Sequence, residues 1–185
     1  MPVPGPHISI AEHAGSPDER ERAQRDHDAV ARLLGRRPQG AFQVVVRDED
    51  GEPVVIRNVA LLDDGTPMPT RYWLVGRPQS VAVSRLETSG GVRRAEAEVD
   101  PVALASAHAR YAAERDRELP EDWSGPRPFG GVGGTRRGVK CLHAHYAWYL
   151  AGGDDPVGRW VADRLKAEAA AAPTGASRGR RPSSA

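Results

Sequence analysis

The chain has 185 residues, of which 39% are hydrophobic and 28% charged, and its formal net charge is +1. This length supports one core of ordinary size, and no apolar run approaches the roughly eighteen residues that span a bilayer. The single cysteine, Cys141, excludes an intramolecular disulfide framework and a cysteine-rich zinc module. The first residues also lack the charged-then-apolar order of a secretory signal. We therefore expect a cytoplasmic protein with no membrane segment.

The basic residues are unevenly placed along the chain. All but two of the 26 are arginines, which together with abundant alanine, glycine and proline indicates GC-rich coding rather than nucleic-acid binding. No helix-turn-helix pattern or basic helix is present, so we do not expect sequence-specific DNA recognition. No acidic residue lies between Asp122 and Asp154, and four basic residues fall in that interval: Arg127, Arg136, Arg137 and Lys140. This local imbalance favours an anionic partner.

The N-terminal part of the chain combines an irregular end with a clear helix signal. Residues 1–15 mix proline, glycine and histidine without periodicity, and the basic residues 172–185 carry little apolar surface, so both ends are predicted to be disordered. Between them we expect a single domain over 16–171. Ser16 followed by Pro17 predicts the start of a helix that Gly35 ends.

Strand signals follow this helix. β-branched runs at 41–47 and 52–57 are joined by Asp-Glu-Asp-Gly at 48–51, which is typical of a tight hairpin. Residues 61–70 contain aspartates, a glycine and two prolines and predict a stiff connection. A short strand is then expected at 72–75.

Helices fill the rest of the chain. They are predicted from 78 to the Gly90-Gly91 pair, over 101–119, over 139–151 and over 156–171, with a long loop at 120–138. Leu104, His108, Tyr111 and Arg115 recur at helical spacing and form a stripe that faces the core. Strands and helices do not alternate as a parallel sheet requires. The sequence therefore predicts an α+β fold, with a small antiparallel sheet packed against several helices.

Three separated segments carry a family resemblance. They read Asp-Gly-Thr-Pro-Met-Pro-Thr-Arg-Tyr-Trp-Leu at 64–74, Ser-Arg-Leu-Glu at 84–87 and Val-Lys-Cys-Leu-His-Ala at 139–144. Together they resemble the bacterial domain of unknown function family 501, over roughly residues 26–162. The resemblance implies no activity, although genes for such proteins often neighbour those of a polyphosphate-hydrolysing enzyme and a cell-division coiled-coil protein.

The chain departs from that family in its cysteines. Many relatives carry cysteine in the hairpin turn and sometimes after the Tyr-Trp-Leu strand, whereas this chain has Asp-Glu-Asp-Gly at 48–51 and Gly76. If those cysteines bind metal in relatives, this chain has lost the metal or replaced thiolates by carboxylates. The resemblance thus weakens a zinc assignment.

The first candidate site is the glycine- and arginine-rich stretch 130–138, which runs into a predicted helix. Free backbone amides at a helix N-terminus attract anions, and arginine can hold a phosphate or carboxylate through two hydrogen bonds. The expected ligand contacts are Gly133, Gly134, Thr135, Arg136, Arg137 and Lys140, with Arg71 from the stiff loop. The stretch matches neither the P-loop nor the dinucleotide fingerprint, so no nucleotide cofactor is firmly implied. A flexible loop with solvated arginines is the alternative.

The second candidate site lies on the helix itself. Cys141 and His145 are four residues apart and would share a helical face, from which His143 would point away. Cys141, His145 and His108 are therefore weak metal-ligand candidates, which would suit a metal-dependent hydrolase. A nucleophilic Cys141 with a histidine base is a further possibility. The catalytic candidates are His143, His145, Cys141, His108 and Asp64; a buried thiol beside structural histidines is the alternative.

These candidates leave three functions open. The leading expectation is that residues 130–145 bind a phosphorylated or otherwise anionic small molecule. The second is a non-catalytic interaction module, in which the basic loop, the basic tail and exposed tryptophans dock an acidic protein partner. The third is the metal-dependent hydrolase. The sequence does not decide whether the protein is an enzyme.

Overall fold

Local signals define the first helix, α1 (Pro17–Leu34), in the computed structural model, which describes residues 16–171. The Ser16 hydroxyl accepts a hydrogen bond from the Glu19 amide, and the Glu19 carboxylate accepts one from the Ser16 amide. This capping box starts the helix, and Gly35, with a φ of 68°, ends it as predicted. The ends predicted to be disordered, 1–15 and 172–185, lie outside the described residues.

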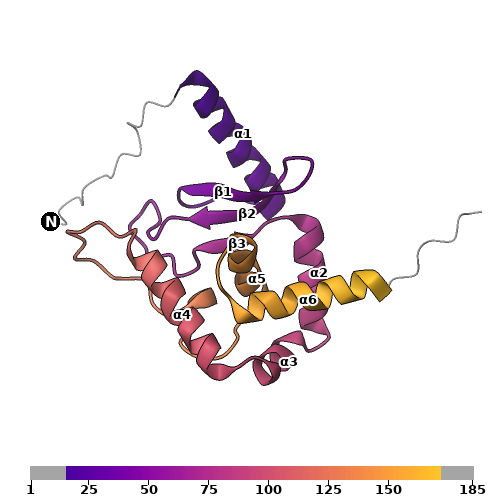
Figure 1. The fold of residues 1–185 in the computed structure, drawn as a ribbon. Helices are drawn as coiled ribbons and strands as arrows, with labels where there is room; N and C mark the ends of the chain where they lie inside the picture. Colours follow the sequence, from indigo (N-terminus) through magenta and orange to yellow (C-terminus); the bar gives the residue numbers. More distant parts are fainter. Residues whose placement is uncertain (1–15, 172–185) are drawn as a thin grey trace, which may run out of the picture.

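The strands form one antiparallel sheet in the order β1-β2-β3 (Figure 1). The strands are β1 (Phe42–Arg47), β2 (Pro53–Asn58) and β3 (Tyr72–Leu74). The predicted hairpin is confirmed, with Gly51 at a φ of 83° in its turn. β2 lies in the middle, and helices cover both sheet faces, which explains the uninterrupted apolar run 54–56.

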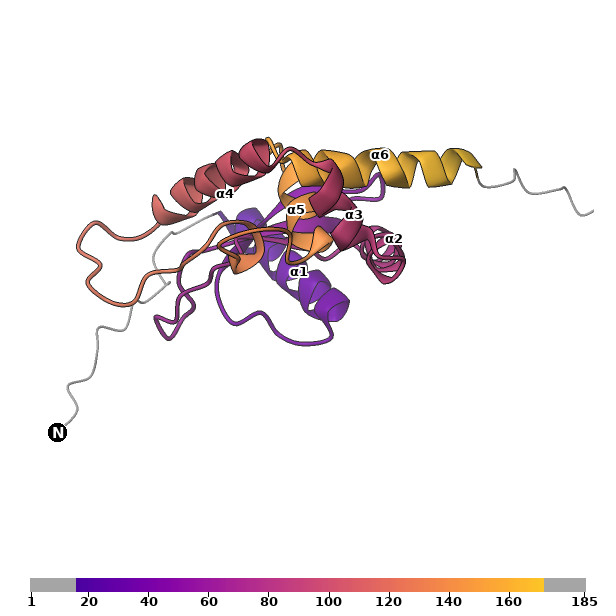
Figure 2. The ribbon, with the colours of Figure 1, turned by 90° about the horizontal axis from the view of Figure 1, so that it is seen from below.

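Alternate residues of β2 face two different layers. Ile56 packs with Val30 of α1 on one face, and α1 lies on that side of the sheet in Figures 1 and 2. Val55 faces the opposite layer, where Tyr72 packs against Tyr111 and Trp148. The sheet therefore separates α1 from the helices that carry the candidate site.

The remaining helices pack together on that second side and around its edge. They are α2 (Arg77–Thr88), α3 (Gly91–Glu98), α4 (Pro101–Asp116), α5 (Leu142–Leu150) and α6 (Pro156–Ala171). A second apolar cluster joins all five of them, and the α+β prediction is confirmed. None of the described helices has the length and apolar character needed to cross a membrane.

Two helix boundaries differ from the prediction. α4 ends at Asp116 rather than 119; residues 117–119 form turns, and Pro120 disfavours helical backbone at Leu119. α5 begins at Leu142 rather than 139, because Cys141 has extended backbone (φ −159°, ψ 132°) and serves as its N-cap. The loop between these helices contains one short helical turn, η1 (Val132–Gly134).

Candidate functional site

A buried arginine of α4 anchors the start of the glycine-rich loop. The Arg115 side chain is 1% exposed, and its guanidinium donates to the carbonyl oxygens of Gly130 (2.8 Å), Pro128 (3.2 Å) and Phe129 (3.3 Å). It also reaches the carbonyl oxygen of Pro69 at 3.4 Å. The core-facing stripe predicted for α4 is confirmed, and its arginine fixes loop backbone rather than solvent ions.

His108, two turns earlier on the same stripe, anchors both ends of the loop. Its Nδ1 accepts a hydrogen bond from the Val132 amide at 3.0 Å, and its Nε2 lies 3.0 Å from the Gly138 carbonyl oxygen. Because a carbonyl can only accept, the ring carries its proton on Nε2. Burial lowers the pKa of His108 below its ordinary value of 6.5. Both nitrogens are engaged, so His108 is a structural clamp and neither the metal ligand nor the catalytic group that we expected.

Carboxylates from two other helices occupy the amides at the start of α5. The Leu142 amide donates to Glu87 of α2 at 2.6 Å, and the Val139 amide donates to Glu96 of α3 at 3.0 Å. A Cβ at Gly138 would clash with the Glu96 carboxylate. The prediction that these amides are free to bind an anion is therefore wrong: the stretch is free of acid in sequence but meets two carboxylates in space.

Three cationic side chains nevertheless stay exposed around the loop. Arg136, Arg137 and Lys140 are all exposed, and within residues 16–171 none of them has an ion-pair partner. The Arg136 guanidinium lies over the Phe129 ring, 5.6 Å from its centroid. The Thr135 hydroxyl donates to the Arg137 carbonyl at 2.7 Å and so bends the backbone between them.

The loop shape depends on Gly133 and Gly134. Their φ values of 67° and 73° lie in the left-handed region that favours glycine. Gly133 faces Ala144 of α5, and Gly134 faces Pro69 of the stiff loop. Gly133 thus places the loop against the first turn of α5, close to Lys140, and Gly134 places it against the stiff loop.

The structure pairs Cys141 with His143 and Glu87, not with His145. The candidate ligand atoms of these three side chains all lie within 4.8 Å of one another. The expected Cys141–His145 pair is wrong because Cys141 precedes the helix, and its extended backbone removes the helical four-residue relation. A hydrogen bond with Cys141 is the largest cause that raises the pKa of His143, to about 9, and the Glu87 charge adds to it.

His145 is instead buried between α5 and α6. Its Nδ1 lies 2.7 Å from the Asp155 carboxylate, whose other oxygen accepts from the amides of Val157 and Gly158 at the start of α6. Its ring meets that of His108 edge-on, with the centroids 5.6 Å apart. With a side chain 1% exposed, His145 holds two helices together and is not a member of the cluster formed by Cys141, His143 and Glu87.

Comparison with known proteins places the chain in a family. The family model described as "Protein of unknown function (DUF501)" matches residues 44–163. The chain belongs to the DUF501 family. The match spans all three segments that carry the resemblance and confirms it. No curated protein and no solved structure matches the chain significantly.

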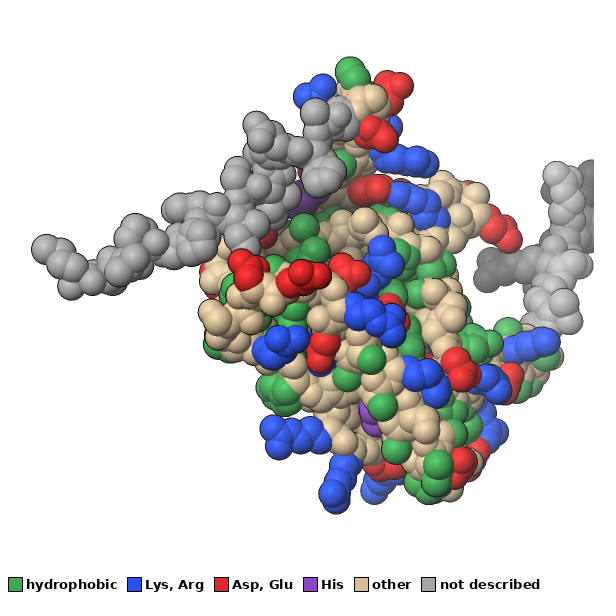
Figure 3. All heavy atoms as spheres, turned by 60° about the vertical axis from the view of Figure 1, so that its left-hand side comes forward, with side chains coloured by type: hydrophobic (Ala, Val, Ile, Leu, Met, Phe, Trp, Pro, Cys, Tyr) green, Lys and Arg blue, Asp and Glu red, His purple; other side chains and the backbone are tan. Residues whose placement is uncertain are grey.

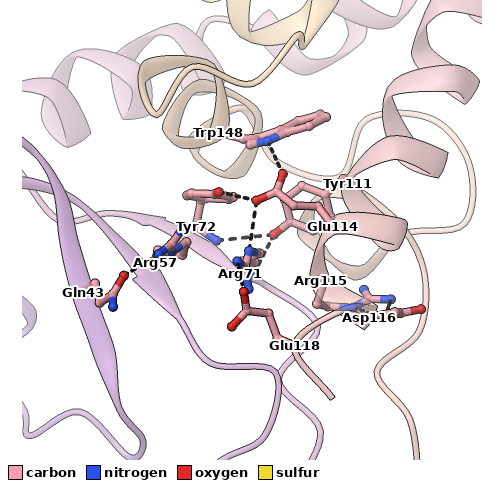
Figure 4. Close-up of polar contacts among 10 residues, drawn as sticks. All are labelled: Gln43, Arg57, Arg71, Tyr72, Tyr111, Glu114, Arg115, Asp116, Glu118 and Trp148. Atoms are coloured by element: carbon pink, nitrogen blue, oxygen red, sulfur yellow. Dashed lines mark hydrogen bonds and ion pairs between the residues drawn. The ribbon is translucent and has the colours of Figure 1, made fainter. Parts of the chain in front are cut away.

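In this DUF501 protein Arg71 contacts protein carboxylates rather than the loop (Figure 4). Its side chain is 3% exposed, and its guanidinium pairs with Glu114 at 3.1 Å and Glu118 at 2.9 Å. Glu114 also accepts from the Tyr72 hydroxyl and, at 3.1 Å, from the Trp148 indole. Tyr72, Glu114 and Trp148 of this network also line a cavity of about 460 Å³ between α4 and the end of α5, whereas Arg71 does not. Arg71 is therefore removed from the expected ligand contacts.

Asp64 is also separate from the other candidates. Its carboxylate accepts a hydrogen bond from the Thr66 amide at 2.9 Å, and this bond lowers its pKa. This turn forms within the exposed stiff loop, where Gly65 faces Trp123. The structure gives Asp64 the role of a turn residue.

Sequence reasoning missed Glu87 and Glu96 as members of the site. Both are ordinary helical glutamates, and their partners lie 55 and 43 residues further along the chain. The one available signal was that residues 84–87 and 139–144 belong to the same resemblance. The DUF501 site combines a hydrogen-bonded loop, whose three cations pair with no acidic residue of the part 16–171, with a cluster of carboxylate, thiol and imidazole groups.

Proposed function

We propose that this DUF501 protein binds a phosphorylated or otherwise anionic small molecule through the side chains of Arg136, Arg137 and Lys140. The observation that carries the proposal is that these three cations are exposed and have no acidic partner among the described residues. Isolated like charges on one short segment repel each other, and an anion relieves that repulsion. We also propose that the protein acts in the cytoplasm.

A fixed backbone supports the proposal, because an ordered site loses less conformational entropy on binding. Arg115 and His108 hold the loop backbone through hydrogen bonds, and Gly133 and Gly134 place it against Ala144 of α5 and against Pro69. The cations therefore project from backbone that is already in place. Only their side chains need to be ordered when the ligand binds.

The ligand contacts differ from those expected from sequence. Glu87 and Glu96 occupy helix amides, so the anion is held by side chains and not by the N-terminus of α5. Guanidinium groups suit phosphate and carboxylate because each presents two parallel donors, and lysine adds a point charge. On the face seen in Figure 3, basic and acidic side chains are interspersed. This favours a small anion over a long polyanion, which needs an extended basic surface.

Thermal unfolding of the full chain tests the proposal directly. Phosphate, pyrophosphate, short polyphosphate and ATP are titrated in buffer that contains a chelator, and at least one is expected to raise the unfolding temperature saturably. Arg136→Ala and Lys140→Ala should each weaken binding about 5- to 30-fold, as expected for the loss of about 1–2 kcal/mol from a charge-assisted contact. Arg22→Ala, an exposed arginine on α1, is the matched control. No saturable shift, or an equal loss in the control, contradicts the proposal.

One observation favours a protein partner as the second candidate. Phe129 is 59% exposed and lies under Arg136, and an exposed aromatic beside a cation is typical of interfaces. The expected exposed tryptophans do not support this candidate, because none of the four is exposed and Trp148 and Trp160 are buried. The variant Phe129→Ala distinguishes small-anion binding from docking of a protein partner. It should leave phosphate binding unchanged and weaken binding of an acidic peptide.

A further inference from the structure

Three different metal-binding side chains converge where α2 meets the start of α5. Glu87 comes from the last turns of α2, Cys141 is the N-cap of α5, and His143 lies in its first turn. Their ligand atoms lie within 4.8 Å of one another, and all three residues are half-buried. We infer that Glu87, Cys141 and His143 form a binding site for a transition-metal ion of the Zn²⁺ type.

The donor set selects the class of metal. Thiolate, imidazole and carboxylate are the three protein ligands of Zn²⁺, whereas Mg²⁺ and Ca²⁺ take oxygen ligands. Bond lengths of 2.0–2.3 Å place tetrahedral ligands about 3.5 Å apart. The His143 Nδ1 and Glu87 oxygen are already 3.3 Å apart. Only a small approach of the Cys141 sulfur is needed to close the triangle.

The contacts of the His143 Nε2 orient the ring so that Nδ1 faces the proposed metal site. Its Nε2 lies 3.2 Å from the Ser80 carbonyl oxygen and 3.2 Å from the Ser84 hydroxyl. The carbonyl can only accept, so Nε2 carries a proton, and Nδ1, which faces Glu87, is the nitrogen that a metal ion would bind in place of a proton. Metal-bound histidines are oriented in this way by a hydrogen bond from the other ring nitrogen.

The other two ligands are held by backbone amides and keep free lone pairs. Glu87 accepts from the Leu142 amide at 2.6 Å, and the Cys141 sulfur accepts from the Ala144 amide at 3.4 Å. A carboxylate has about four lone-pair positions, so this bond leaves room for a metal. Three protein ligands leave the fourth position of a tetrahedron for water or an anion. The site goes beyond the anion-binding function and does not depend on it.

Cobalt and zinc titrations of the full chain test the site, in phosphate-free buffer with a reducing agent. Co²⁺ is expected to bind with one equivalent and to give thiolate-to-cobalt charge transfer with the intense visible bands of tetrahedral coordination. Zn²⁺ should displace it. Cys141→Ser should abolish the charge-transfer band, and Glu87→Gln and His143→Gln should each weaken Co²⁺ binding at least tenfold.

Two controls distinguish loss of the metal site from misfolding and from metal binding by other histidines. Serine is a favourable N-cap, so Cys141→Ser should retain the native circular dichroism spectrum and unfolding temperature of the metal-free protein. The double variant His7→Gln and His13→Gln should bind Co²⁺ as the wild type does. Absence of the charge-transfer band in the wild type, or its persistence in Cys141→Ser, overturns the inference. Loss of anion binding alone leaves it intact.

Discussion

The Glu87 carboxylate lies 2.6 Å from the Leu142 amide and so caps α5 from a different helix. Helix N-termini leave amides without partners, and a carboxylate there also meets the positive end of the helix dipole. In this chain that carboxylate comes from 55 residues earlier. α2 and α5 are thus joined where the candidate metal ligands meet.

Removing this cap should destabilise the protein. Glu87→Ala leaves the Leu142 amide without its acceptor and should lower the free energy of unfolding by about 1–2 kcal/mol. Glu87→Gln keeps a carbonyl acceptor and should cost less. Urea unfolding of both variants measures the difference, with Glu21→Ala on the exposed face of α1 as control. Equal stability of the alanine and glutamine variants contradicts the capping role.

Stability should fall in mildly acidic solution because of His108. Burial lowers its folded pKa below 6.5, so below that pH the unfolded chain binds a proton that the folded protein does not. The free energy of unfolding should therefore decrease as pH falls from 6.5 toward the folded pKa, and this contribution is fully present above 6.5. His108→Gln should flatten the dependence, and denaturant midpoints from pH 7 to 5 measure it. Parallel curves for wild type and variant rule out His108 as the source.

Gly131 should tolerate no side chain. A Cβ there would clash with the His108 ring. Gly131→Ala should cost about 1–3 kcal/mol through overpacking and should speed hydrogen exchange of the Val132 amide. Gly35→Ala, with a positive φ but open space around it, is the comparison and should leave that amide protected. Unchanged Val132 exchange in Gly131→Ala indicates that the His108 bond survives.

Glu114 should contribute more to the free energy of unfolding than Glu118, which lies one turn further along the chain. Glu114→Ala leaves the buried Arg71 with one carboxylate and leaves the Tyr72 hydroxyl and Trp148 indole without an acceptor. We expect a loss of about 2–3 kcal/mol. Glu118 is 46% exposed, so Glu118→Ala should cost at most about 1 kcal/mol. Chemical denaturation of the two variants provides the test, and a larger loss for Glu118→Ala contradicts this ranking.

The parts of the fold that sequence predicted are those with local causes. Ser16, Pro17 and Gly35 define α1 through contacts within a few residues, and the 48–51 turn fixes the hairpin. The α4 stripe was also correct, because its period alone places His108 and Arg115 toward the core. These features need no knowledge of distant segments.

The site was less predictable because its partners are distant in sequence. The backbone of Cys141 depends on where α5 starts, and Glu87 supplies the cap there. The predicted helix start at 139 lies three residues before Leu142 and wrongly placed Cys141 on the same helical face as His145. The run without acidic residues was likewise misleading, because Glu96 approaches Val139 from α3. The charges that are close in sequence therefore do not predict the charges that surround a site in the folded protein.

Asp155 accepts three hydrogen bonds, two from the first amides of α6 and one from His145 in α5. Because one fully buried carboxylate serves both helices, rotation or translation of α5 would break the His145–Asp155 hydrogen bond or displace the carboxylate that caps α6. The two helices should then open together, as a single cooperative unit in native-state hydrogen exchange, with their amides sharing one opening free energy. A ligand that shifts the first turn of α5 should thereby change the opening free energy of the amides of α6.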